Sequence, residues 1–228
     1  MRGLLLALEG LDGAGKSTQA DALARRLSQA GRVCHVLRLY GNEILNRQFG
    51  GLNGSSLIGA REAALMTAAD LAGRMEGFGV PSLRRGETVV WDKYVAGSRA
   101  RDRARGTPDA LLSAVYDPLP APDLTIFFDL PPEQAALRKR NDGGPKLWES
   151  GLDVALKLPV AEIQRRLEEG AITPGAVEKQ FVKFQSGVRA FYEDLLDPRR
   201  TVRIDAARPH EEIAEEVWGL ILSLRPRQ

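Results

Sequence analysis

The sequence predicts an α/β protein of three layers, in which helices cover both faces of a five-stranded parallel sheet. Three observations predict it: short apolar segments rich in branched residues, helical spacing of apolar residues between them, and glycine or proline at many of the junctions. Because alternating strands and helices join parallel neighbours through crossover connections, one continuous sheet is expected.

The predicted strands are mostly continuous apolar runs, which is the pattern of parallel strands buried on both faces. The first run, LLLAL, is followed directly by a glycine-rich loop and is too short to span a membrane. The predicted strands cover residues 4–8, 32–39, 87–92, 123–130 and 200–205.

The predicted helices fill the segments between these strands. In the first of them Ala20, Leu23 and Leu27 share one face, and Gly31 supplies the stop. A pair of prolines opens the helix after the fourth strand, because proline is tolerated in a first turn. The predicted helices cover residues 16–30, 61–76, 96–104, 109–116, a segment that begins at 131, 160–169, 175–196 and 209–224, and a glycine- and asparagine-rich loop is expected between 41 and 59.

A basic, glycine-containing segment, RKRNDGGPKLWESG, interrupts the helical periodicity after the fourth strand. It is predicted to be an exposed, mobile flap. The chain of 228 residues suits one large core, so we expect a single domain over residues 1–228, with the flap and a helical insert at about 139–179. The sequence leaves the role of residues 152–179 open.

The overall composition excludes several classes of protein. The formal net charge is only +2, from 32 basic and 30 acidic residues, which argues against a nucleic-acid partner. The single cysteine, Cys34, cannot form an internal disulfide and suits a reducing compartment, so the expected location is the cytoplasm. No membrane partner is expected, because no apolar run is long enough.

Residues 9–19, EGLDGAGKSTQ, carry the strongest chemical signal. Gly10, four further residues, then Gly15, Lys16 and Ser17 fit the Walker A pattern of the P-loop NTPase fold, between a predicted strand and a predicted helix. Such glycines let backbone N–H groups surround phosphate oxygens, while the lysine neutralises the terminal phosphates and the serine can hold Mg²⁺. A phosphorylated nucleotide is therefore the expected ligand. The other candidate loop residues are Gly13, Ala14 and Thr18, the last of which serves equally well as an ordinary residue of the first helical turn.

The carboxylate of Asp12 is unexpected in a phosphate loop. Triphosphate would repel it unless it faces away. We therefore predict that Asp12 faces a second substrate, with capping of a helix end as the alternative.

Four segments in order resemble thymidylate kinases: ALEGLDGAGKSTQ, VVWDKY, FFDLPPEQAALRKR and IDAARPHEEI. The resemblance covers most of the chain. It implies an ATP- and Mg²⁺-dependent kinase of a nucleoside monophosphate, with dTMP as the leading acceptor and dTDP as the product, and a homodimer. It also implies that Asp12 serves the sugar 3′ region of the acceptor.

The same resemblance implies further roles. Asp92 would hold the Mg²⁺ hydration shell together with Ser17, and Lys93 stands where the family has an arginine, so it keeps the charge without the two-pronged grip. Arg138 would lie over adenine and Arg140 at the phosphates. The implied catalytic residues are thus Lys16, Asp92 and Arg140; Ala206 lies in the adenine-side loop, and Tyr94 and Ser98 belong to the acceptor-side segment. Lys139 and Lys146 are looser candidates, and Trp148 and Glu149 resemble the end of the family's flap, although the tryptophan fits local packing equally well.

The sequence departs from the family where the acceptor base is read. Thr67 stands where a phenylalanine stacks on thymine, Leu71 where an arginine reaches the base, and Asp102 where a glutamine assists. Losing a stacked ring forfeits on the order of 1 kcal/mol. Arg74 is a candidate replacement, with a surface cation as the simpler interpretation, and RLYGNE at 38–43 replaces another family segment.

These departures leave two alternatives open. One is a kinase of a modified pyrimidine nucleotide or of a nucleoside. The other is a nucleotide-binding regulatory protein that has kept the loop without turnover.

Overall fold

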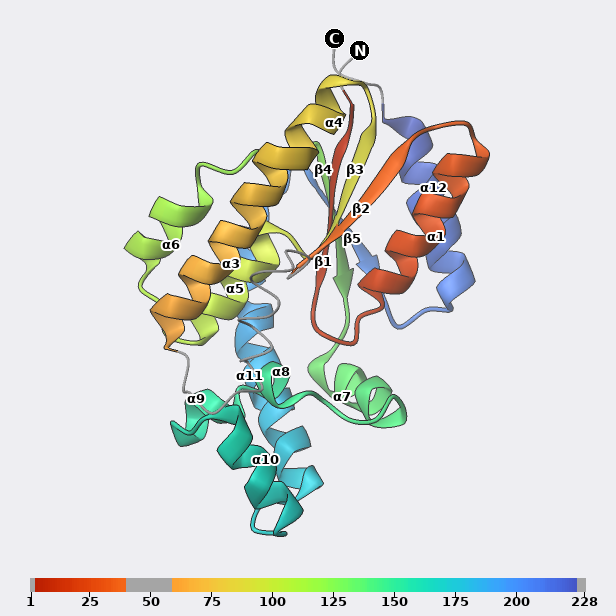
Figure 1. The fold of residues 1–228 in the computed structure, drawn as a ribbon. Helices are drawn as coiled ribbons and strands as arrows, with labels where there is room; N and C mark the ends of the chain where they lie inside the picture. Colours follow the sequence, from red (N-terminus) through yellow and green to blue (C-terminus); the bar gives the residue numbers. More distant parts are fainter. Residues whose placement is uncertain (1–2, 40–58, 225–228) are drawn as a thin grey trace.

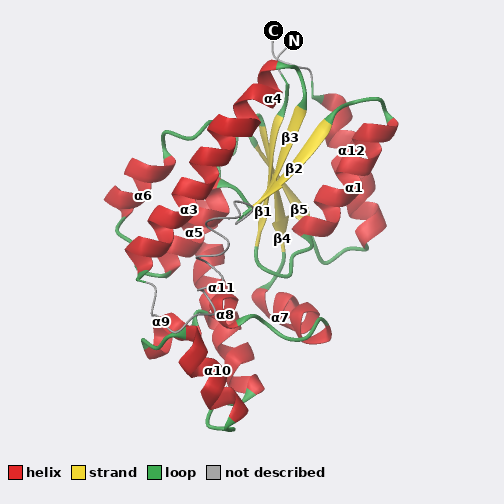
Figure 2. Cartoon of the chain, in the orientation of Figure 1, coloured by secondary structure: helices red, strands yellow, loops and turns green. Residues whose placement is uncertain are grey.

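The computed structural model describes residues 3–39 and 59–224. Its centre is a parallel sheet with the strand order β2-β3-β1-β4-β5 (Figures 1 and 2). This confirms the predicted five-stranded α/β fold. The strands are β1 (Leu5–Gly10), β2 (Cys34–Arg38), β3 (Thr88–Asp92), β4 (Leu124–Asp129) and β5 (Thr201–Asp205).

Side chains of β1 alternate between two cores, because successive residues of a strand face opposite sides of the sheet. Leu6 and Leu8 belong to the core beneath α1 (Lys16–Gln29) and α12 (His210–Ser223). Leu5 and Ala7 belong to the core on the opposite face. Three layers result (Figure 1).

The helices of that opposite face are α3, α5 and α6, beside the sheet in Figure 1, with part of the long α11. The predicted strand and helix positions agree with the structure to within a few residues at most ends. These helices are α3 (Ala60–Arg74), α5 (Val95–Ala104), α6 (Asp109–Tyr116) and α11 (Pro174–Leu195). The loop predicted at 41–59, and most of the RLYGNE segment, lie outside the described residues.

One helix runs further than predicted. Instead of ending at 76, α3 continues through a π-helical turn, η2 (Met75–Gly79), into α4 (Val80–Arg84). Two glycines and a proline follow the predicted end, but this proline lies in the first turn of α4, where proline is tolerated. The Sδ atom of Met75 accepts a hydrogen bond from Nε1 of the buried Trp91 at 3.0 Å, which fixes the π turn against β3.

The segment after β4 is more ordered than a loop. It contains α7 (Pro132–Asn141), α8 (Leu147–Ser150), α9 (Leu152–Leu156) and α10 (Val160–Glu168), which lie with the outer half of α11 beyond the sheet (Figure 1). Leu147 and Leu152 are buried in a small cluster with Ile163 and Val177, and this cluster stabilises the short helices. Among the described residues, no helix is long and apolar enough to cross a membrane.

Candidate active site

A cavity of about 930 Å³ opens at the carboxyl end of the strands. Its floor is the loop between β1 and α1, where the sequence predicts the phosphate site. The wall includes residues of β3, α5 and the segment 138–149, together with Arg38, Leu39 and residues between 206 and 213. Proteins with open parallel sheets bind ligands at the carboxyl ends of the strands.

The loop adopts a conformation that requires glycine. Gly10 has a φ of +143°, and a Cβ atom there would lie 2.6 Å from the carbonyl oxygen of Phe128 on β4. Gly13 and Gly15 also have positive φ, and Gly15 precedes α1 without a side-chain cap. The first N–H groups of α1 are therefore available for an anion.

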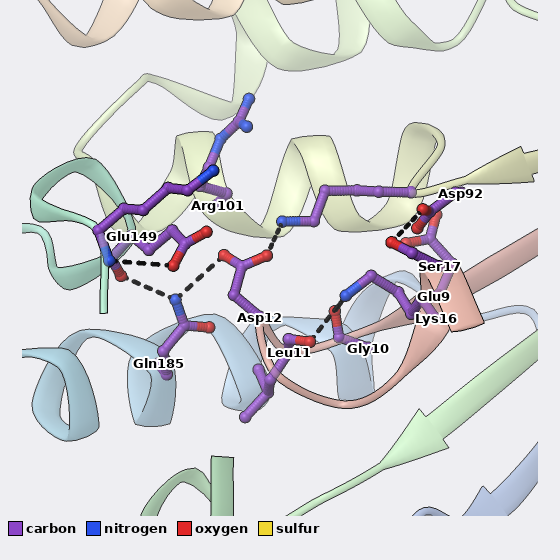
Figure 3. Close-up of polar contacts among 12 residues, drawn as sticks. Glu9, Gly10, Leu11, Asp12, Lys16, Ser17, Asp92, Arg101, Glu149 and Gln185 are labelled. Carbon is purple, nitrogen blue, oxygen red and sulfur yellow. Dashed lines mark hydrogen bonds and ion pairs between the residues drawn. The ribbon is translucent and has the colours of Figure 1, made fainter. Parts of the chain in front are cut away.

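The Lys16 side chain lies folded over the loop, with only 7% of the residue exposed. Its Nζ donates hydrogen bonds to the carbonyl oxygens of Gly10 at 3.0 Å and Leu11 at 2.7 Å (Figure 3). Burial lowers the pKa of Lys16, and the nearby Lys93 lowers it further against the pull of surrounding carboxylates. A bound polyphosphate would replace these carbonyls as the lysine's partner.

Ser17 and Asp92 face each other at the carboxyl end of the strands. Ser17 Oγ donates to Asp92 Oδ2 at 2.5 Å, and Nε of Arg38 lies 3.7 Å from the same oxygen. A hydroxyl and a carboxylate suit Mg²⁺, which binds through one or two protein oxygens and keeps several waters. No cluster of three or more His, Cys, Asp or Glu residues that could hold a metal occurs within 3–39 and 59–224, and such a Mg²⁺ site needs none.

Asp12 points toward the same cavity but away from Lys16 (Figure 3). Its Oδ1 accepts a hydrogen bond from Nζ of Lys93 at 2.7 Å, and its Oδ2 lies 3.4 Å from Nε2 of Gln185. Burial acts to raise the pKa of Asp12, but Lys93 and Lys16 outweigh it and hold the pKa below the ordinary value.

A buried acid, Glu9, lies directly before the phosphate loop and is hydrogen-bonded to residues that pack against it. Glu9, with none of its surface exposed, accepts hydrogen bonds from Tyr94 N and from the Tyr192 hydroxyl, both at 3.1 Å. The same hydroxyl accepts the N–H of Gly10 at 3.2 Å. Burial raises the pKa of Glu9. Sequence reasoning missed this group, although an acidic residue closing an apolar strand is a usable signal.

The segment 138–149 covers the cavity. Arg138 donates to the carbonyl oxygen of Ala206 at 2.7 Å, and both residues line the cavity. Lys139 pairs with Glu149 at 2.8 Å, and the carbonyl oxygen of Glu149 accepts a hydrogen bond from Gln185 at 2.9 Å. Gln185 thus connects α8 to the Asp12 region (Figure 3).

Arg140 does not line the cavity in this structure. Its guanidinium pairs with Glu178 on α11, and 61% of the Arg140 side chain is exposed. The side chains of Arg138 and Lys139 on α7 line the cavity, whereas the ion pair with Glu178 holds the Arg140 guanidinium against α11. The structure brings Arg138 and Lys139 to the site and leaves Arg140 outside it.

The predicted acceptor-side residues are mostly covered. Tyr94 is fully buried and donates to the carbonyl oxygen of Pro120 at 3.1 Å, and Ser98 is fully buried as well. Thr67 and Asp102 are fully buried, and both accept hydrogen bonds from Arg101, which does line the cavity.

Arg74, the suggested replacement for a lost base reader, lies elsewhere. It donates to the carbonyl oxygen of Arg38 and lies over the ring of Trp91 at 5.0 Å. It does not line the cavity.

This fold and site define a P-loop nucleotide-binding protein of the kinase type: a glycine loop and lysine at the first strand, an acid at the end of β3, and a cationic covering segment. The sequence matches the family model for thymidylate kinase over residues 8–147. The chain belongs to the thymidylate kinase family.

Individual relatives agree with this assignment. The thymidylate kinase of Xanthomonas campestris pv. campestris (strain B100) is 37% identical over 142 residues, 62% of this chain and 62% of the relative, so the match spans less than two thirds of that relative's length. The thymidylate kinase of Rhodopseudomonas palustris is 30% identical over 97% of this chain and 89% of its own. A probable thymidylate kinase 2 of Saccharolobus solfataricus is 27% identical over 97% of this chain and 96% of its own.

Proposed function

We propose that this protein transfers the γ-phosphoryl group of ATP to dTMP and forms dTDP and ADP. One observation carries the proposal: the same cavity contains the phosphate loop and the ion pair of Asp12 with Lys93. The carboxylate of Asp12 points away from Lys16, the lysine of the phosphate loop (Figure 3). Relatives that match this protein over most of its sequence bear the name thymidylate kinase, which supports dTMP as the acceptor.

The ATP site follows from the lining of the cavity. Residues 13–18 would surround the β- and γ-phosphates, with Lys16 neutralising their charge. Arg138 and Ala206, joined by a hydrogen bond, would contact the adenine. Mg²⁺ would be held through Ser17 and Asp92, and when bound it neutralises charge on the transferred group.

The acceptor site is the region around Asp12. Lys93 would contact the acceptor phosphate, and the Asp12 carboxylate would accept a hydrogen bond from the sugar 3′-hydroxyl. A phosphate monoester is largely dianionic at neutral pH, so its oxygen attacks without a general base from the protein. The protein contributes positioning and neutralisation of charge, which are the main requirements of phosphoryl transfer.

We further propose that residues 1–228 form one domain with a flap and a helical insert at about 139–179, in which the flap covers the reaction. Lys139 and Lys146, both in the lining of the cavity, would bring positive charge to the transferred phosphoryl group. The catalytic set proposed from the sequence, Lys16, Asp92 and Arg140, includes one residue that would have to leave Glu178 to take part.

Two supporting proposals concern assembly and location. We propose a homodimer, in keeping with the family resemblance and with Leu65 on α3, which is 49% exposed. We propose the cytoplasm, since the sequence has one cysteine. Sedimentation equilibrium of the purified protein tests the first proposal, and localisation of a tagged protein tests the second.

The deciding experiment is a coupled ADP-release assay with a panel of acceptors: dTMP, dUMP, dCMP, a modified pyrimidine nucleotide and thymidine. We expect Mg²⁺-dependent turnover that is fastest with dTMP, and Asp12→Ala should weaken use of the acceptor more than ATP binding. Turnover restricted to another acceptor would exclude dTMP. Tight ATP binding without turnover on any acceptor would instead favour a regulatory protein.

A further inference from the structure

The residues at the positions where the family reads the acceptor base do not reach the cavity. Thr67, Leu71 and Asp102 are each 0% exposed and are absent from its lining. Two other side chains line that part of the wall: Arg101 from α5 and Trp148 from α8. Neither was selected as a base reader from the sequence.

Arg101 is a buried guanidinium in a fixed position. Its Nε and Nη2 atoms each donate to Asp102 Oδ1 at 3.2 Å, and Nη2 donates to Thr67 Oγ1 at 3.0 Å. Asp102 is itself held by the Tyr116 hydroxyl at 2.5 Å. A guanidinium has five N–H donors and no acceptor, so a ligand that meets it has to offer a lone pair.

Trp148 is held by the same helix. The guanidinium of Arg105 lies 3.3 Å from the centroid of the Trp148 ring, and Arg105, the C-cap residue of α5, follows Arg101 by one helical turn. Arg105 is fixed in turn by an ion pair with Asp153, in which 1% and 2% of the two side chains are exposed. The helix α5 therefore sets the positions of both cavity-lining side chains.

The part of Trp148 that reaches the cavity is carbon. Its Nε1 atom is buried and has no hydrogen-bond partner among the described residues, and one face of the ring is covered by Arg105. A half-buried indole that offers carbon surface to a nucleotide site is suited to stacking on a base.

We propose that Trp148 and Arg101 form the base-recognition part of the acceptor site. Trp148 stacks on the base and Arg101 donates to the O4 carbonyl oxygen of a pyrimidine, while Asp102 and Arg105 are positioning residues. The inference rests on the proposed function and deepens it. It assigns thymine or uracil rather than cytosine, because an exocyclic amino group facing Arg101 would bring donor against donor.

The test compares Trp148→Phe, Trp148→Ala, Arg101→Lys and Arg101→Met with two matched controls. The controls are Trp218→Phe, a tryptophan outside the cavity, and Arg103→Met, an arginine of α5 that pairs with Asp109 and Asp194. Steady-state kinetics give the KM for acceptor and for ATP separately, and thermal melts confirm that each variant is folded.

We expect Trp148→Ala to raise the acceptor KM roughly tenfold with the ATP KM nearly unchanged, and Trp148→Phe to retain most of the affinity. Arg101→Met should reduce the preference for dTMP over dCMP by roughly tenfold, a ratio that a merely structural role would not change. Arg101→Lys should recover part of this preference. Binding of dTMP should quench tryptophan emission in the wild type and in Trp218→Phe, but not in Trp148→Phe.

Several outcomes would overturn the inference. One is an acceptor KM and a base preference that stay within about twofold of the wild type in Trp148→Ala and Arg101→Met. Another is a rise in the ATP KM alone, which would place Trp148 beside the donor. Absence of turnover in the wild type would refute the proposed function instead, and the quenching titration would then decide the inference by itself.

Discussion

The ammonium group of Lys93 donates to the carboxylate of Asp12 at 2.7 Å and so joins the end of β3 to the phosphate loop. Lys93 has a left-handed backbone, with a φ of 67°, directly after the strand. The pair keeps an acid ionised inside a site built for anions, because the two lysines near Asp12 outweigh the effect of burial on its pKa. In the proposed function, the donor and acceptor halves of the cavity meet at this contact.

Removing the cation of this pair should change the pH dependence. In Lys93→Met the pKa of Asp12 should rise, since burial would then act with less opposition. The acid limb of kcat/KM for the acceptor should therefore move to higher pH, and activity at neutral pH should fall roughly tenfold or more through the lost phosphate contact. Lys93→Arg, which retains the charge, is the control. An acid limb that does not move would show that Asp12 has no part in acceptor use.

The buried Glu9 gives a second pH effect, on stability. Burial raises its pKa in the folded state above the ordinary value of 4.5. The contribution of Glu9 to the stability of the folded protein is therefore fully present below pH 4.5 and is lost as the pH rises through the folded-state pKa. Glu9→Gln should remove this loss, so the melting temperature of the variant relative to the wild type should increase from acidic to neutral pH. A difference in melting temperature between Glu9→Gln and the wild type that is the same at every pH would contradict the raised pKa.

Gly97 should tolerate no side chain. A Cβ atom there would lie 2.4 Å from Oε2 of Glu9 and 2.5 Å from the Tyr192 hydroxyl. Gly97→Ala should disturb the support of the phosphate loop and destabilise the protein by roughly 1–3 kcal/mol, the usual cost of overpacking. Gly187→Ala on α11 meets nothing within 4 Å and should be neutral or stabilising. Urea unfolding of both variants makes the comparison.

The two neighbouring cations at the end of α7 should differ in effect. Lys139→Ala should lower kcat roughly tenfold or more, because Lys139 lines the cavity beside Glu149. Arg140→Ala should have a smaller effect, because its guanidinium pairs with Glu178 outside. Single-turnover rates at saturating ATP measure both. A larger loss in Arg140→Ala would mean that the flap rearranges and that the role predicted from the sequence is correct.

The buried pair Arg105 and Asp153 should be sensitive to removal of one partner. Asp153→Asn should destabilise the protein by about 3–5 kcal/mol, because it leaves a buried guanidinium without its counter-charge. A double replacement, Arg105→Met with Asp153→Leu, should recover much of this loss. Equilibrium denaturation of the wild type, Asp153→Asn and the double variant measures the three stabilities. A double variant less stable than Asp153→Asn would contradict the prediction.

Local patterns were sufficient for most elements of the fold. The apolar runs and the helical spacing located the strands and the longer helices, since burial of one face leaves a period in the sequence. They failed at η2 and α4, where glycine and proline suggested an end but packing of Met75 on Trp91 continued the helix. They failed also at α8 and α9, which are too short to show a period and are stabilised by contacts with α10 and α11.

Site residues divided in the same way. The phosphate loop was predictable, because its glycines, lysine and hydroxyl occupy one continuous segment. Whether Thr67, Asp102 and Arg140 reach the cavity was not predictable, because each depends on a partner distant in sequence: Arg101 for the first two and Glu178 for the third.

The sequence by itself determined that this protein has a parallel sheet with a phosphate-binding loop at its first strand, because both are recorded in residues adjacent along the chain. Only the tertiary structure decided which side chains share the cavity. Burial and pairing across α5, α7, α8 and α11 bring Arg101, Lys139 and Trp148 inward and leave Arg140 outside, and such contacts arise only when segments far apart in the chain pack together.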